Sequence, residues 1–351
     1  MRLLVPLAFL VPCSLIAQQR TLSLGAPDAR LAIEFSELTT MRELADGRVL
    51  LFDRREERLL VADFAAGSVR DVARRGQGPA EFEAVFALLP LAGDSTIAAD
   101  VTRRWLILVG DSVTRKLLPD HAALQRASAP LGTDVYGHVL ARAFGAATPD
   151  STPIVLVHRA SGNAVTIARL ANEGRRGPGT TPGVGGSFQV RRIPLQTSES
   201  PLLFNDGWVA VVRIDPYRVD WRSPDGNWTS GRPLPMRAIR VTAAEKAAYI
   251  RRKPGFRNAT DWPSDMPPFE TPVTLLAAPD GQLLVKRLPT LAEPGTRYDV
   301  IDRAGNRLTQ LVFAANEHIL GFGARSVYVV ETDDDGIQRL RRHPLYPSLR
   351  P

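Results

Sequence analysis

Six charged residues stand at one recurring place in the sequence, at the end of a short apolar run that follows a turn. In chain order they are Asp53, Asp100, Arg142, Arg213, Lys286 and Glu331. If the six runs are equivalent strands of a closed ring, the three acidic positions are contiguous and so are the three basic ones. The mouth of such a ring, where its central channel opens, could orient a ligand that carries both a positive and a negative charge. It could also hold an anion on its basic half, with Arg287 nearby. In the alternative, these charges pair with neighbours such as Arg54, Arg103 and Asp215 and bind nothing.

The sequence contains no pattern of a known catalytic or metal centre. Five histidines are scattered along the chain and never form a close pair in it: His121, His138, His158, His318 and His343. Zinc needs at least three converging protein ligands. The Asp-Asp-Asp-Gly run at residues 333–336 lacks the ligand spacing of a calcium loop and reads as a hairpin tip. Neither a Gly-x-Ser-x-Gly elbow nor a phosphate-binding glycine loop occurs. We therefore name no catalytic residue and no metal ligand, and we expect no cofactor.

Arginine supplies nearly all the positive charge of the chain. Of 44 basic residues only four are lysines (Lys116, Lys246, Lys253 and Lys286), and the net charge is +7. A basic surface attracts anions of many kinds. The charges are nevertheless spread along the chain and form no basic tail or helix. Nucleic acid is therefore not an expected partner; we expect a small anionic ligand, a glycan or a protein.

The first 17 residues have the composition of a secretory signal. Arg2 precedes an apolar run that is too short to span a bilayer comfortably, and cleavage after Ala17 would leave residues 18–351 as one mature domain. Cys13 is the only cysteine and follows Pro12, whereas a lipoprotein signal has a small residue there, so we expect no lipid anchor. A mature chain without cysteine forms no disulfide. No later run is long enough to cross a membrane, and we expect a secreted or periplasmic monomer.

Asp-Gly pairs punctuate the chain, and between apolar runs such pairs are a strong hairpin signal. They occur at residues 46–47, 206–207, 225–226, 280–281 and 335–336. Three of these pairs directly precede a strand-like run. Three further strand-like runs occupy the same place in the repeat without an Asp-Gly pair, so the chain divides into six units. Each unit holds four short strand-like segments, with a period of about 45 residues where nothing is inserted. This order predicts an all-β fold, a six-bladed β-propeller with four antiparallel strands per blade. A long sandwich or two separate domains would explain the period less well.

Two of the spacings are longer because they contain inserts, at about residues 172–197 and 236–271. The first insert is rich in glycine and reads as a flexible surface loop. The second starts with one short helix, since residues 242–245 form a capping box and Pro254 follows its end. Residues 74–82 form the joint between the first two units. We expect both inserts and this joint to lie on one face of the propeller. There they could either cap the core or offer ligand contacts, and the candidates are Arg191, Arg192, Trp262 and Phe269.

The last unit holds only three strands before the chain ends. Residues 19–24, directly after the signal, have no strand partner of their own. We expect this N-terminal strand to complete the last blade, because closure in this way leaves no open blade edge between the two ends of the chain.

Residues 76–82, Gly-Gln-Gly-Pro-Ala-Glu-Phe, resemble the glycine-rich joint of NHL-type repeats. Residues 268–272, Pro-Phe-Glu-Thr-Pro, with the strand and the Asp-Gly pair that follow, resemble the later blades of secreted six-bladed β-propellers of bacteria. The resemblance covers about residues 20–345 and implies the propeller fold. Propellers with this joint include binding scaffolds and, more distantly, lyases and lactone or ester hydrolases, so the fold does not settle the activity.

Two functions follow from this resemblance and from the residues. The first is a secreted binding or scaffold module without catalysis, which holds its ligand or partner at the loop-bearing face around the central channel. We favour it because no catalytic set converges in the sequence. The alternative is a metal-assisted hydrolase or lyase of the lactonase-like type, with one divalent cation such as Ca²⁺. That group uses a Glu, an Asn and an Asp around its ion, and no such set can be assigned here.

Overall fold

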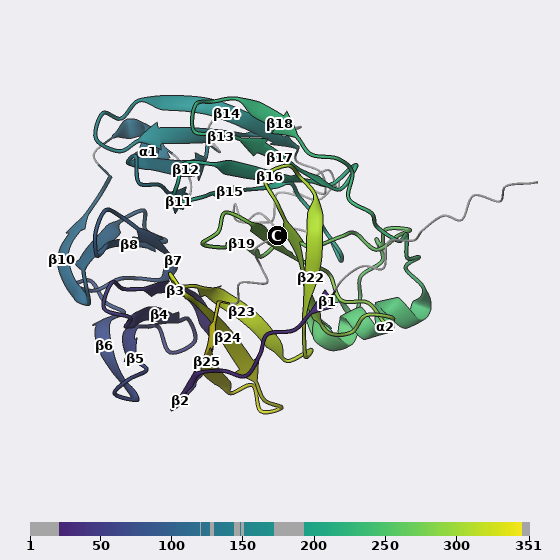
Figure 1. The fold of residues 1–351 in the computed structure, drawn as a ribbon, viewed down its shortest axis with the longest axis horizontal. Coiled ribbons are helices and arrows are strands. Elements are labelled where there is room, and N and C mark those ends of the chain that lie inside the picture. Colours follow the sequence, from purple (N-terminus) through teal and green to yellow (C-terminus); the bar gives the residue numbers. More distant parts are fainter. Residues whose placement is uncertain are drawn as a thin grey trace, which may run out of the picture.

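The computed structural model describes residues 21–119, 121–126, 130–143, 148, 151–171 and 193–345. They form six sheets, each built of four antiparallel strands, arranged around a common centre, which confirms the predicted six-bladed β-propeller (Figure 1); the short strand β1 (Thr21–Leu22) adds to one of them as a fifth, parallel strand. The expected signal segment, with Cys13, lies outside the described residues.

The chain runs through the blades in order and, within each blade, from the inner strand outwards. Blade 1 holds β3 (Leu38–Glu43), β4 (Val49–Asp53), β5 (Arg58–Asp63) and β6 (Ser68–Arg74). Blade 2 holds β7 (Val85–Pro90), β8 (Ser95–Asp100), β9 (Trp105–Val109) and β10 (Ser112–Leu117). Blade 3 holds β11 (Pro130–Thr133), β12 (His138–Arg142), β13 (Ser151–His158) and β14 (Ala164–Ala171).

The remaining blades repeat this order. Blade 4 holds β15 (Ser200–Leu203), β16 (Val209–Arg213), β17 (Arg218–Arg222) and β18 (Trp228–Ser230). Blade 5 holds β19 (Leu275–Ala277), β20 (Leu283–Lys286), β21 (Thr296–Ile301) and β22 (Arg307–Phe313). Blade 6 holds β23 (Glu317–Phe322), β24 (Ser326–Thr332), β25 (Gln338–Pro344) and β2 (Ala29–Phe35). The inner strand of each blade contacts the inner strands of both neighbouring blades.

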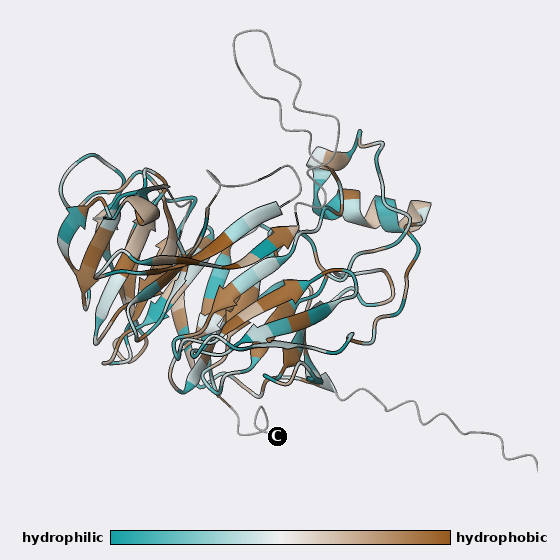
Figure 2. Cartoon of the chain, turned by 90° about the horizontal axis from the view of Figure 1, so that it is seen from above, coloured by the Kyte–Doolittle hydropathy of each residue, from teal (hydrophilic) through white to brown (hydrophobic). Residues whose placement is uncertain are grey.

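The hydrophobic core lies between the blades, because each sheet is covered by another sheet on both faces. Strand β4 illustrates the pattern. Leu50 and Phe52 pack towards blade 2, where they meet Leu106, whereas Leu51 packs towards blade 6, where it meets Tyr328. Successive side chains of a strand point to opposite faces, so a second strand that is apolar at every position can fill two cores at once. The outer strand β6 is largely exposed and polar, and Figure 2 shows the apolar residues concentrated in the strands of the ring.

The Asp-Gly pairs form the turns that the sequence predicts. The glycines at positions 47, 207, 226, 281 and 336 all have positive φ, between 81° and 98°, and each lies between two paired strands. Glycine reaches this backbone region at no steric cost, which is why it marks hairpin turns.

The N-terminal segment closes the ring, but with a different strand from the one expected. Strand β2 (Ala29–Phe35) pairs antiparallel with β25 and is the fourth strand of blade 6. Residues 19–24 were expected in that place; their described part, β1 (Thr21–Leu22), instead pairs parallel with β22 at the outer edge of blade 5. Burial decides between the two, because Leu31 and Phe35 enter the core between blades 6 and 1.

Helices are few and lie in the connections. A short helix, α1 (Ala122–Arg126), precedes blade 3, and α2 (Ala243–Arg252), followed by the 3-10 turn Pro254–Phe256, belongs to the second insert and stands outside the ring of sheets (Figures 1 and 2). The predicted cap of α2 is present, since the Thr242 side chain accepts a hydrogen bond from the backbone N–H of Glu245 at 3.3 Å. None of the described helices is both long and apolar enough to cross a membrane.

Truncation from the N-terminus separates the two strands of this segment. A chain that begins at residue 29 should fold, because it loses only β1 and the connection to β2. A chain that begins at residue 36 should lose about 3–6 kcal/mol through Leu31 and Phe35 alone and should aggregate at the uncovered edge of β25. Thermal unfolding followed by circular dichroism measures both. Equal stability of the two truncated proteins would contradict the assignment of β2 as the closing strand.

Candidate functional site

The six charged residues singled out in the sequence do occupy equivalent places. Asp53, Asp100, Arg142, Arg213 and Lys286 are the last residues of the second strands of blades 1 to 5, and Glu331 is the last but one of β24 in blade 6. The links between strands two and three, and the joints between blades, leave the sheets at this end of the second strands. We call this side of the ring the loop-bearing face.

Asp53 and Asp100 are structural residues and do not form an acidic half of the mouth, which corrects the expectation. Each is only 2% exposed. Asp53 accepts backbone N–H bonds from Ser36 at 2.7 Å and Glu37 at 3.0 Å, directly before the inner strand of its blade. Asp100 accepts the N–H of Glu83 at 2.7 Å in the same way. Both carboxylates therefore hold the joint that enters their own blade.

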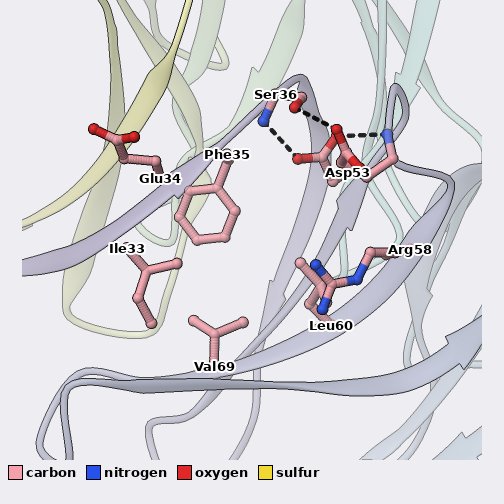
Figure 3. A pocket seen from close by; sticks show the side chains of 9 residues that line it. Ile33, Glu34, Phe35, Ser36, Asp53, Arg58, Leu60 and Val69 are labelled. Atoms are coloured by element: carbon pink, nitrogen blue, oxygen red, sulfur yellow. Dashed lines mark hydrogen bonds between the residues drawn. The ribbon is translucent and has the colours of Figure 1, made fainter.

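Asp53 also lines a groove on the outer side of the ring. The groove has a volume of about 270 Å³ and lies between closing strand β2 and blade 1, with Phe35 and Leu60 among the lining residues (Figure 3). Figure 3 shows the Asp53 carboxylate turned towards the backbone at Ser36. Because the Asp53 carboxylate already accepts hydrogen bonds from backbone N–H groups, it is not available to a ligand in this groove.

Most of the other charges at the strand ends are also paired. Arg213 is held by Glu199 and Asp220, each at 2.8 Å. Glu331 lies 3.3 Å from the guanidinium of Arg341, which also pairs with Glu317. Arg142 is half-buried and likewise has an interaction partner. These charges are therefore mostly paired with neighbours, as in the alternative, but the partners found are Glu199, Asp220 and Arg341 and not the Arg54, Arg103 and Asp215 named from the sequence.

Arg287 belongs to a buried network between blades 4 and 5. Its guanidinium lies 3.0 Å from Asp299, a fully buried carboxylate that also accepts hydrogen bonds from Tyr217 at 2.9 Å and Gln310 at 2.6 Å. Burial lowers the pKa of Arg287, but the charge and hydrogen bond of Asp299, with smaller contributions from Tyr217 and Glu293, together outweigh burial, and the net pKa is raised. Burial and the same carboxylate raise the pKa of Tyr217. With its charge neutralised inside the protein, Arg287 holds two blades together.

Lys286 differs from the other five residues of the ring. Its ammonium group forms no hydrogen bond or ion pair with any described residue. Burial, and then the positive charge of Lys253, lower the pKa of Lys286. Burial and the charge of Lys286 in turn lower the pKa of His318 to about 4. Lys286 thus carries an uncompensated positive charge near the inner strand of blade 6.

The second insert covers the region around Lys286. Lys253, at the end of α2, pairs with Glu270 at 2.8 Å, and the Tyr249 hydroxyl donates a hydrogen bond to the same carboxylate. The described end of the first insert is attached to the second: the backbone N–H of Leu195 donates to the Tyr249 oxygen at 3.3 Å, and the N–H of Thr271 donates to the carbonyl of Gln196 at 2.8 Å. The described end of the first insert, residues 193–197, therefore lies against the second insert.

The four residues of the inserts that were candidates for ligand contacts differ in their burial and in whether the structure describes them. Trp262 is half-buried and packs edge-on against Tyr249, with ring centroids 5.6 Å apart. Phe269 is 1% exposed and packs against Tyr217 in the core between blades 4 and 5, so of its two expected roles it has the one of covering the core. Arg191 and Arg192 lie outside the described residues.

No pattern in the sequence places His318 or Lys253 in this region. His318 is the second residue of an inner strand, and only the packing of blade 5 against blade 6 brings it to Lys286. Within the described residues, no three histidine, cysteine, aspartate or glutamate side chains come together as ligands for one metal ion.

Comparison with known proteins identifies the fold and no family. No family model and no curated protein matches the chain. Among solved structures, a protein from Bacteroides fragilis NCTC 9343, whose name describes a proposed exported protein, aligns with TM-score 0.52 and 11% identity over 92% of this chain and 94% of its own. A member of the DUF4221 family from Bacteroides vulgatus aligns with TM-score 0.50 and 8% identity over 90% and 96%.

A third solved structure, a calcium-binding regucalcin from Agrobacterium tumefaciens, aligns with TM-score 0.46 and 12% identity over 93% of this chain and 99% of its own. At these identities the first two likenesses establish a shared propeller fold, and no activity is transferred from any of the three.

The low pKa of His318 makes stability depend on pH. The folded chain resists protonation of this imidazole until about pH 4, whereas the unfolded chain protonates it near pH 6.5. The stabilisation by neutral His318 is therefore complete above pH 6.5 and is lost as the pH falls towards 4. His318→Gln should remove up to about 3 kcal/mol of this acid destabilisation.

Urea unfolding at a series of pH values measures the effect, with His121→Gln as the control that should keep the original slope. An unchanged slope in His318→Gln would show that this imidazole is not buried near Lys286.

The role of Asp53 is tested by its removal. Asp53→Ala should lower the free energy of unfolding by about 2–4 kcal/mol, because the backbone donors at residues 36 and 37 lose their acceptor. Asp53→Asn keeps one acceptor oxygen and should lose less. Equilibrium unfolding in urea measures both, and a wild-type stability of Asp53→Ala would refute the structural role.

Proposed function

We propose that this protein is a secreted β-propeller that binds a small anionic ligand, without catalysis, at the loop-bearing face around the central channel. The observation that carries the proposal is the ammonium group of Lys286, which has no partner among the described residues at a position where the other ring charges are paired. The anion would lie under the second insert, between blade 5 and the inner strand of blade 6.

The electrostatics support an anion here. A buried ammonium is unfavourable unless a negative charge compensates it, and Lys253 adds to the positive potential at Lys286. Lys253 is itself paired with Glu270, so the charge that remains for a ligand is that of Lys286. A lysine binds carboxylate or phosphate as a point charge, without the fixed geometry of an arginine.

His318 gives the proposed site a pH response. An anion beside Lys286 would favour the protonated imidazole, whose pKa is lowered to about 4 in the free protein. Binding should therefore tighten as the pH falls from about 6.5 towards 4, because the ligand and the proton stabilise one another.

The apolar segment after Arg2 supports secretion of the mature domain, and a structural neighbour with a name that proposes export is compatible with it. The NHL-like joint at residues 76–82 supports placement among the secreted propellers of bacteria. For the lactonase-like alternative no observation in the described residues provides a ligand set.

Substitution of one lysine tests the proposal. Lys286→Met keeps the length and apolar character of the side chain and removes the charge. Isothermal titration of the purified protein with citrate and with inorganic phosphate should show binding that is lost in Lys286→Met, while the stability is kept or rises, because the buried charge is gone.

Lys246→Met is the matched control, since it removes a lysine charge from the second insert, where Lys246 lies over the ring of Trp262. It should bind both anions as the unsubstituted protein does. Equal affinities of Lys286→Met and Lys246→Met would end the proposal, and a stoichiometric Ca²⁺ ion in the purified protein would favour the enzyme instead.

A further inference from the structure

Two histidines that are far apart in the chain lie opposite one another in blade 3. His138 begins β12 and His158 ends β13, and the register pairs these two residues directly. Their ring centroids are 5.5 Å apart, and the ring planes form an angle of 72°. The pair lies at the opposite end of β12 from Arg142, and hence on the side of the ring away from the loop-bearing face.

We propose that His138 and His158 form a binding site for one divalent transition-metal ion, Cu²⁺, Ni²⁺ or Zn²⁺, through their Nε2 atoms. The site is independent of the anion site at Lys286 and lies on the other side of the propeller.

The separation of the rings suits a shared ion. Two imidazoles that bind one metal through Nε2 at about 2.0–2.1 Å have their centroids roughly 4.5–6 Å apart, and the observed 5.5 Å falls in that range. The Nε2 atom of His158 lies over the backbone of Gly137, the neighbour of His138: a Cβ atom placed on Gly137 would be 3.8 Å from it. The Nε2 atom of His158 thus lies on the side where the two residues meet.

The second nitrogen of the His138 ring is held in the way that metal-binding histidines require. The Nδ1 atom of His138 donates to the Asp134 carboxylate at 2.8 Å. Asp134 is itself fixed, because it is 4% exposed and accepts the backbone N–H groups of Tyr136 at 3.0 Å and His138 at 2.8 Å. A carboxylate on Nδ1 leaves Nε2 without its proton and makes it a better ligand.

His158 has the corresponding partner in a hydroxyl group. Its Nδ1 atom lies 3.0 Å from the Ser161 oxygen and 3.3 Å from the Ser161 backbone nitrogen. For metal binding the proton of His158 must reside on Nδ1 and be donated to the Ser161 oxygen, which leaves the Nε2 lone pair for the ion. In the structure Nδ1 accepts the Ser161 backbone N–H, so this change of tautomer gives up that hydrogen bond and the N–H must then be satisfied by water.

The site is accessible and has two protein ligands. The His138 side chain is 31% exposed, and His158 is half-buried, so water can complete the coordination. Since no third histidine, cysteine, aspartate or glutamate joins the pair among the described residues, the affinity should be lower than that of a closed four-ligand zinc site. Imidazole ligands select Cu²⁺, Ni²⁺ and Zn²⁺ over Mg²⁺ and Ca²⁺, which prefer oxygen.

Isothermal titration of untagged protein with each of the five ions, in a buffer that does not bind metals, tests the proposal. One equivalent of Cu²⁺ should bind most tightly, followed by Ni²⁺ and Zn²⁺, with no heat from Mg²⁺ or Ca²⁺. His138→Gln and His158→Gln should each lower the affinity for Ni²⁺ and Zn²⁺ at least tenfold. Electron paramagnetic resonance of the Cu²⁺ complex should show two nitrogen ligands in the unsubstituted protein.

Two further variants separate the pair from its surroundings. Asp134→Asn should lower the affinity for Zn²⁺ about 10–100-fold, because the amide donates to Nδ1 and leaves the proton on Nε2. His121→Gln is the control: His121 packs against Gly162 in the turn beside His158, yet its removal should leave the affinity unchanged.

Circular dichroism confirms that each variant is folded, and the resonance spectrum of the unsubstituted protein remains decisive if one is not. Absence of Ni²⁺ and Zn²⁺ binding, unchanged affinity in both pair variants, or loss of binding in His121→Gln would each overturn the assignment.

Discussion

Burial of every blade between two others is the constraint on which this structure depends. The second strands are apolar at successive positions, so that one strand supplies side chains to two different cores, as Leu50 and Leu51 of β4 do. A sheet of this kind is stable only when both faces are covered, which requires a closed ring. The position of β2 follows from this need, because without Leu31 and Phe35 the core between blades 6 and 1 would lack its outer wall.

The joints between blades are a second consequence of the ring. Each joint must return the chain from an outer strand to the next inner strand, and its backbone N–H groups then need acceptors. Blades 1 and 2 use a carboxylate at the end of strand two, Asp53 or Asp100, as that acceptor. Blade 4 holds the residue before its inner strand by the ion pair between Arg213 and Glu199. A charged residue at this place is therefore first a structural element, and only an unpaired one is free for a ligand.

Lys286 is such a residue, and its surroundings come from three parts of the chain. It ends β20, Lys253 belongs to the second insert, and His318 belongs to the inner strand of blade 6. Burial and the charge of Lys253 lower the pKa of Lys286, and burial and the charge of Lys286 lower the pKa of His318, so the three groups lie close together in a poorly solvated place. The opposite side of the propeller carries a different kind of group, the pair His138 and His158 of blade 3, so anion and metal would bind in different blades and on opposite faces of the ring.

The sequence by itself determined the number of blades, the hairpin glycines, the helix cap at Thr242 and the equivalence of the strand-two ends, because these depend on local backbone preference and on the period of apolar residues. Only the tertiary structure decided which N-terminal strand closes the ring, that Phe269 is buried, and which charges are paired. It also brought His138 and His158 together across 20 positions of sequence. Whether a side chain is buried or paired depends on which other strands pack against it. A local sequence pattern does not contain that information.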